Sequence, residues 1–143
     1  QFMRNFFLFK LLVFYLILTF SVESKQNNFF DKGLKLFEKG NFDQSKILFE
    51  KDIVFNPKSE KSYLYLAKIF NNIENDQEEE INLNNVLIIN PLNDEAIYML
   101  TLLKIKQSDY DKAKELISQF NLVCNTFCSK KNEMEKKFEK LKP

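Results

Sequence analysis

The sequence is defined first by what it lacks. It has no histidine, two glycines, three prolines and two cysteines in 143 residues. Without histidine, the chain lacks the most common general acid-base group and the most common zinc ligand, and two cysteines cannot complete a usual four-ligand zinc site. Two glycines are too few for a glycine-rich phosphate loop. No nucleophile lies near a plausible base, so we predict no catalytic residues, no metal and no cofactor, and hence a protein that is not an enzyme.

The few prolines reveal a repeat. Asn56-Pro57 and Asn90-Pro91 lie 34 residues apart, and each pair closes an apolar stretch that follows an earlier apolar stretch. A shift of 34 residues superposes large residues on large and small on small, as in these three sets: Phe29, Tyr63 and Ile97; Gly33, Ala67 and Thr101; Phe49, Leu83 and Ile117. A unit that cannot bury its own apolar face stacks on its neighbours, and this period is typical of helical hairpins.

Helical spacing supports this reading independently. In residues 42–55 the apolar side chains recur with a helical period, and in residues 96–105 they nearly surround the helix. Gly40 falls between two helices, where a left-handed C-terminal residue is expected. Ser59, and then Asn93 or Asp94, are expected N-caps just after each proline. The alternative, an irregular helical bundle with chance prolines, does not explain why three copies keep the same phase.

Residues 26–120 resemble the tetratricopeptide repeat in three tandem copies, about two thirds of the chain. The matching positions are Gly33, Gly40–Asp43, Ser45, Phe49 and Pro57 in the first copy, Tyr63, Leu66, Ala67, Phe70, Leu83, Val86 and Pro91 in the second, and Leu100, Asp109–Asp111, Ala113, Ile117 and Phe120 in the third. The sequence departs from the family pattern at Lys32, Asp52, Glu79 and Asn125. The resemblance implies an all-α fold, a right-handed α-solenoid with hairpins at about 26–59, 60–93 and 94–125 (residues 25–125 as a whole), followed by a C-terminal capping helix in residues 126–143.

The N-terminal segment has the three-part layout of a secretory signal peptide. Arg4 and Lys10 precede a largely apolar run over residues 11–20. Residues 21–24 follow, with a small residue available for cleavage after Ser24. We therefore expect residues 1–24 to be a signal peptide and the protein to be exported, to a bacterial periplasm or to a secretory lumen and the extracellular space. The alternative is an uncleaved signal anchor, in which Lys10 reaches the interface and the protein stays membrane-anchored.

Charge argues against nucleic acid as a partner. Subtracting Arg4 and Lys10 from the 21 basic residues, and Glu23 from the 20 acidic ones, leaves 19 of each. No basic stripe runs along the repeats, as phosphate binding would require. An acidic group at Glu74, Asp76, Glu78, Glu79 and Glu80 is interpreted as a solvated helix start, favoured by the helix dipole, with a weak calcium site as the alternative.

Cys124 and Cys128 lie where the chain leaves the third hairpin. In an oxidising compartment such a pair can close, because four residues in a helical turn or tight bend bring two Cα atoms within about 7 Å. We predict a disulfide that fixes the bend before the last helix; two free buried thiols are the alternative if the chain is not exported. Beyond it, Phe127, Met134, Phe138 and Leu141 form an apolar stripe on a lysine-rich segment. We expect this helix to cover the open end of the array, the alternative being a basic helix on an anionic membrane.

Function is then expected on the concave face, which the resemblance assigns to the first helix of each hairpin. The predicted groove consists of Phe30, Leu34, Phe37, Leu64, Lys68, Tyr98, Leu102 and Ile105. This largely apolar set does not suit the carboxylate tail of a chaperone, but it suits a protein partner in the form of a peptide or an amphipathic helix. The alternative is that some of these side chains pack within the array or against a second copy of the protein. The sequence thus predicts an exported interaction scaffold or, if the anchor stays attached, a membrane-tethered subunit of a larger assembly.

Overall fold

The computed structural model describes residues 28–141 as a purely helical chain, with no β-strand in this range. The elements are α2 (Phe29–Glu38), α3 (Phe42–Phe55), α4 (Glu60–Asn72), α5 (Asp76–Ile89), α6 (Asp94–Lys106), α7 (Tyr110–Val123), the 3-10 helix η1 (Cys128–Lys130) and α8 (Lys131–Leu141). The predictions of a signal peptide or signal anchor in residues 1–24 lie outside the described residues. Within them, every helix is too short or too polar to cross a lipid bilayer.

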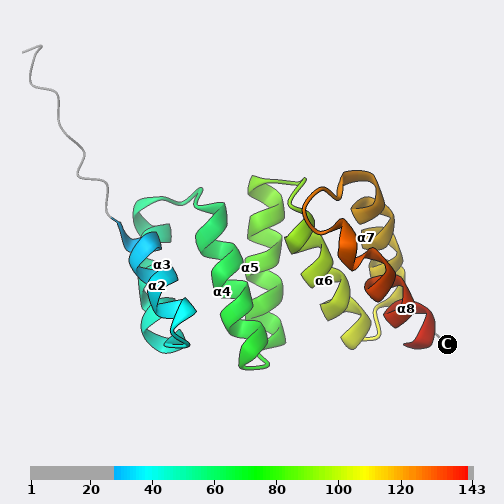
Figure 1. Cartoon of the computed structure of the whole chain (residues 1–143), viewed down its shortest axis with the longest axis horizontal. Coiled ribbons are helices and arrows are strands. Elements are labelled where there is room, and N and C mark those ends of the chain that lie inside the picture. The colour runs from blue at the N-terminus through cyan, green and yellow to red at the C-terminus, as the bar shows by residue number, and fades with distance from the viewer. Residues whose placement is uncertain (1–27, 142–143) are drawn as a thin grey trace, which may run out of the picture.

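The helices form three hairpins stacked side by side, followed by α8 (Figure 1). Each helix from α2 to α7 packs against the next one along the chain, and α8 packs against both α6 and α7. Such an array of stacked helical pairs is an α-solenoid. The predicted all-α solenoid fold is confirmed.

The turn inside each hairpin contains one residue in the left-handed region, always at the same place in the repeat. These residues are Gly40, Glu74 and Ser108, with φ values of 74°, 57° and 62°. In each turn the amide of the next residue donates back to a carbonyl five residues earlier at 2.9 Å, as Asn41 does to Leu36. This bond satisfies a carbonyl at the helix end, so the left-handed residue lets the chain reverse tightly. Glycine fills the position only in the first hairpin.

The two helices of the first hairpin approach each other closely at Gly33. A Cβ atom at this position would lie 2.8 Å from Cε1 of Phe49, closer than real atoms come. Ser45 on α3 is fully buried, and its hydroxyl donates to the Gly33 carbonyl at 2.8 Å. The corresponding residues of the other hairpins, Ala67 and Thr101, are also fully buried. A small side chain at this step of the repeat therefore sets the spacing within each hairpin.

The core has an aromatic half and an aliphatic half. Between α2, α3 and α4 it is built on Phe49, Leu66, Ile69 and Phe70. From α4 onward it is mostly aliphatic and extends to α8, where Met134 is fully buried and Phe138 nearly so. The apolar stripe of α8 thus covers the end of the third hairpin, and Leu141 at its end stays half exposed.

Polar side chains fix the step from the first to the second hairpin. Asp52 of α3 is buried, and its Oδ2 accepts hydrogen bonds from the hydroxyls of Ser59 at 2.5 Å and Ser62 at 2.6 Å. Ser59 therefore donates its hydroxyl to Asp52 and makes no side-chain cap of α4, whereas Asn93 caps α6 by accepting from the amide of Ala96 at 2.8 Å. Asp52 stands where the repeat pattern expects a small residue, and the two serines supply hydrogen bonds to its buried carboxylate.

Candidate functional site

The eight predicted groove residues all lie on the first helices of the hairpins, and none is fully exposed. Five of them are half-buried, namely Phe30, Leu34, Phe37, Lys68 and Leu102. The other three are buried, namely Leu64, Tyr98 and Ile105. The three buried residues pack within the array, as the alternative interpretation expected. Their side chains belong to the core of the protein and offer little surface to a partner.

The aromatic residues of the first hairpin are largely engaged with one another. The ring of Phe30 lies 5.7 Å from that of Phe49 and 5.8 Å from that of Tyr65. The ring of Phe37 lies 5.0 Å from Tyr65 and 5.2 Å from Phe42, both edge to face. These contacts join α2, α3 and α4 and leave Phe30 and Phe37 only half-buried.

Tyr98 is covered by the C-terminal segment. Its ring lies 5.9 Å from that of Phe127, and its hydroxyl donates to Oε1 of Glu133 on α8 at 3.0 Å. Burial of the ring, together with the hydrogen bond to the Glu133 carboxylate, raises the pKa of Tyr98 to about 12. Sequence reasoning placed α8 at the end of the array but did not foresee that it would cover this side chain.

Lys68, the one charged residue of the predicted groove, is paired. Its Nζ lies 2.7 Å from Oε1 of Glu95 on α6 and 4.6 Å from the centre of the Tyr65 ring. Half-buried pairs of this kind orient a side chain more than they stabilise the fold. Lys68 therefore ties α4 to α6 across the face of the first helices.

Two hollows open along the first helices, at opposite ends of α4. The first, of about 480 Å³, lies near the starts of α2 and α4 and is mostly polar; Phe30, Asp31, Asp52 and Glu60 are among its lining residues. The second, of about 420 Å³, lies between the ends of α4 and α6 and the helix α8. Its lining residues are Asn71, Leu102, Leu103, Ile105, Lys106, Lys137 and Leu141. We call this second hollow the apolar cleft.

The apolar cleft is the part of the predicted groove that remains open. Leu102 and Ile105 were predicted, and both line it together with Leu103; Leu102 is half-buried, whereas Leu103 and Ile105 are buried. Leu141 stands at its edge with 49% of its surface exposed. Lys137 and Leu141 come from α8, and sequence reasoning missed them because it treated that helix only as a cap. The apolar stripe of Met134, Phe138 and Leu141 could have indicated their role in the cleft. Its first two residues are buried, whereas Leu141 at its end stays half exposed.

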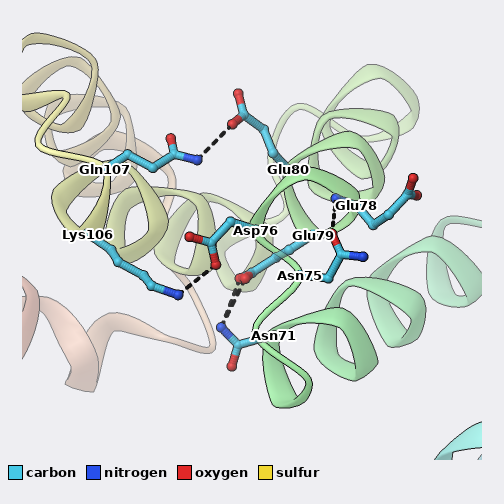
Figure 2. A network of polar contacts seen from close by, with 8 residues as sticks. All are labelled: Asn71, Asn75, Asp76, Glu78, Glu79, Glu80, Lys106 and Gln107. Carbon is cyan, nitrogen blue, oxygen red and sulfur yellow. Dashed lines mark hydrogen bonds and ion pairs between the residues drawn. The ribbon is translucent and has the colours of Figure 1, made fainter.

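The acidic group at the start of α5 forms a network that joins α5 to α4 and α6 (Figure 2). Asp76 Oδ1 lies 2.6 Å from Nζ of Lys106, and Glu80 Oε1 lies 2.6 Å from Nζ of Lys104. The hydrogen bond from Lys104 lowers the pKa of Glu80, and the hydrogen bond to Asp76 raises the pKa of Lys106. These ion pairs orient the end of α6, where the apolar cleft lies.

Glu79 corrects the interpretation of this group as a solvated helix start. Its side chain is 1% exposed, and both carboxylate oxygens accept from Nδ2 of Asn71 at 3.1 Å. Burial raises the pKa of Glu79, although the hydrogen bond from Asn71 opposes this shift. Nor do the carboxylates of residues 28–141 suggest the alternative of a calcium site, because no group of three or more potential ligands is placed to hold a metal ion.

Cys124 and Cys128 form a disulfide with their Cα atoms 5.2 Å apart. The loop that it closes is held by Asp94, at the start of α6. One oxygen of Asp94 accepts from the amides of Asn125 at 2.7 Å and Phe127 at 2.8 Å, and the other accepts from the Thr126 hydroxyl at 2.9 Å. Burial opposes the charge of this carboxylate, but the hydrogen bonds outweigh burial and lower the pKa of Asp94. Disulfide and carboxylate together fix the bend that leads into α8.

No protein-family model matches the sequence, and neither does any curated protein. Solved structures do match the fold. The first TPR of Spaghetti (RPAP3) bound to the HSP90 peptide SRMEEVD superposes with a TM-score of 0.71 at 17% identity, over 82% of this chain and 95% of that chain. The crystal structure of MamA gives 0.65 at 19% identity, over 82% and 78%, and the CopN-Scc3 complex gives 0.66 at 13% identity, over 88% and 74%. The chain therefore has the fold of a tetratricopeptide-repeat array.

Proposed function

We propose that this protein is a non-enzymatic interaction scaffold that holds a protein partner, as a peptide or a helix, in the apolar cleft. The observation that carries the proposal is the apolar cleft between α4, α6 and α8, where Leu102 and Leu141 offer accessible apolar surface beside the buried Leu103 and Ile105. A similar structure, the first TPR of Spaghetti, is bound to a peptide, which supports a peptide as the occupant.

The cleft suits an apolar anchor on the partner. Burying one large aliphatic or aromatic side chain there contributes about 1.5–3 kcal/mol, and one or two such anchors commonly dominate a peptide interface. Phe30, Leu34 and Phe37 lie farther along the same row of first helices and would contact the rest of an extended partner. Phosphate contacts are not expected, because Lys104, Lys106 and Lys68 are already paired with carboxylates.

The proposal is tested by selecting peptides from a random phage-displayed library on the purified protein. We expect enriched peptides with large apolar residues, and at least about tenfold weaker binding to a Leu141→Glu variant, which places a charge at the cleft edge. Leu141 is half exposed, so this substitution leaves the core intact.

The matched control is Leu92→Glu, at another exposed leucine, in the turn between α5 and α6. It should bind the selected peptides as the unmodified protein does. Failure to enrich any peptide, or equal binding by the Leu141→Glu variant, would overturn the proposal.

We further propose that the scaffold acts outside the cytoplasm after removal of residues 1–24. The disulfide supports this, because such bonds persist mainly in oxidising compartments. The competing proposal is a membrane-tethered subunit with the N-terminal segment still attached; it keeps the same disulfide and the same cleft, so only the N-terminus of the natural protein separates the two.

A further inference from the structure

The apolar cleft also has polar lining residues, and the fold does not use all of their bonding capacity. These residues are Asn71 of α4, Lys106 of α6 and Lys137 of α8. None of the described lining residues carries a carboxylate. Lys106 is already paired, since its Nζ lies 2.6 Å from Oδ1 of Asp76. The groups left to recognise a partner are therefore Lys137 and the side-chain amide of Asn71.

Lys137 is a cation without an ion pair within residues 28–141. Glu133, one turn earlier on α8, is occupied: one oxygen lies 2.9 Å from Nζ of Lys130, and the other accepts from the Tyr98 hydroxyl at 3.0 Å. The dipole of α8 does not account for Lys137 either, because Lys140 supplies the positive charge in the last turn. Lys137 is thus able to pair with a carboxylate of a partner in the cleft.

The side-chain amide of Asn71 is held in one orientation by a buried acid. Both carboxylate oxygens of Glu79 accept from Nδ2 of Asn71 at 3.1 Å. Because an ionised carboxylate only accepts, the amide nitrogen faces Glu79 and the amide oxygen points the other way (Figure 2). Asn71 is exposed, and no donor in residues 28–141 bonds this oxygen. The cleft therefore offers a fixed acceptor for an N–H group of a partner.

The fold itself does not require an acid at Glu79. A shift of 34 residues places Ser45 and Ala113 at the same position of the other hairpins, and both are fully buried. A buried acid costs free energy unless nearby donors satisfy it. A small residue would avoid this cost, which points to a role for Glu79 in orienting Asn71.

A fixed acceptor favours an extended partner over a helical one. The N–H groups inside a helix already donate within the helix, whereas those of an extended segment are free to bind. Alternate residues of an extended segment point to the same side, about 6.7 Å apart. Lys137 and Leu141 are four residues apart in α8, a rise of about 6 Å. The two spacings match closely enough for alternate side chains of a partner to reach both residues.

We propose that the apolar cleft binds an extended segment in which one residue separates a large apolar side chain from an acidic one. The apolar side chain packs between Leu102 and Leu141, and the carboxylate pairs with Lys137. Asn71 accepts from a backbone N–H, and Glu79 is a positioning residue that holds the Asn71 amide. This inference rests on the proposed function and specifies the chemistry of its partner.

The charge preference is tested by selecting phage-displayed peptides on three proteins. The unmodified protein should enrich Asp or Glu two positions from the apolar residue. Exposed ion pairs are weak, so changing that acid to its amide in a synthetic peptide should weaken binding about two- to fivefold. Lys137→Glu should instead enrich Lys or Arg there, a reversal that a loss of structure would not produce. Lys136→Glu, at an exposed lysine outside the cleft, is the control and should still select acids.

The outcomes separate this inference from the proposed function. Apolar peptides without the acidic preference, or an unchanged preference in Lys137→Glu, would overturn the inference and leave the proposed function standing. No enrichment of any peptide would overturn both.

The role of Asn71 is tested with a selected peptide that is N-methylated at one backbone nitrogen at a time. One methyl group should weaken binding about fivefold, because it removes the N–H that Asn71 accepts. The loss should fall below about twofold in Glu79→Ala, where the amide is free to turn, and in the Asn71→Ala, Glu79→Ala double variant, which leaves no buried acid. A peptide that tolerates every methyl group, or an equal loss in both variants, would overturn these roles.

Discussion

At the scale of single residues, the least expected feature is the set of buried carboxylates. Asp52, Glu79 and Asp94 are each less than a tenth exposed, and each accepts hydrogen bonds from nearby donors. Among residues 28–141, no buried side-chain nitrogen or oxygen lacks a partner. A buried acid without donors would cost several kcal/mol, so these donors are part of the fold.

Glu79 should make stability depend on pH in a particular direction. Because burial raises its pKa, the folded protein binds this proton more tightly than the unfolded chain does, and stability falls as the pH rises from the usual Glu range through the raised value. A Glu79→Gln variant lacks this loss. We therefore compare the free energies of unfolding in urea of the variant and the unmodified protein. From pH 4.5, the ordinary pKa of a Glu side chain, to neutral pH, the variant should become more stable relative to the unmodified protein.

Glu78→Gln serves as the control, because this side chain points away from Asn71 and the network (Figure 2). Its difference from the unmodified protein should change little with pH. Glu80 and Asp94 have lowered pKa values and act in the opposite direction, but they are common to all three proteins and cancel in the comparison. A Glu79→Gln difference that shrinks as the pH rises would contradict the expectation.

At the scale of elements, the repeat made much of the structure predictable. A period of 34 residues, closing prolines and small residues at one step predicted an all-α solenoid because they encode local geometry that recurs. The sequence could not show how α8 lies across α6, since that depends on contacts between distant side chains such as Tyr98 and Glu133. For the same reason Tyr98 was predicted in a groove but is buried.

The loop before α8 was also beyond prediction, because its anchor is more than 30 residues away. Asp94 holds the loop through three hydrogen bonds. Asp94→Asn removes the charge that these donors stabilise, so we expect a loss of about 1–3 kcal/mol in the free energy of unfolding. Hydrogen exchange measured by mass spectrometry should become faster in residues 125–141.

Glu95→Gln provides a matched control on the adjacent residue. Its carboxylate makes a half-buried ion pair with Lys68, which is expected to contribute less than about 1 kcal/mol. It should leave exchange in α8 unchanged. Equal effects of the two substitutions would mean that Asp94 has no special role in seating α8.

At the scale of the whole molecule, the array has two separate surfaces with different chemistry. The apolar cleft lies between first helices and depends on α8, whereas the second helices carry the exposed aliphatic residues Val54, Ile88 and Leu122. A partner that binds in the cleft leaves these side chains accessible, because they lie on other helices.

The partners that the protein can meet depend on its compartment. The mass of the natural chain tests whether the protein is exported and cleaved. We expect intact mass spectrometry of protein from its native cell to give a chain that begins near Lys25. Reduction and alkylation should then add two alkyl groups, because Cys124 and Cys128 are joined. Cleavage at that point would separate the neutral repeat array from the apolar segment and would release the protein as a scaffold. A chain that keeps the N-terminal segment and also contains the disulfide would favour the membrane-tethered subunit. Free thiols on that uncleaved chain would refute export, since an oxidising compartment would close a pair placed this close together.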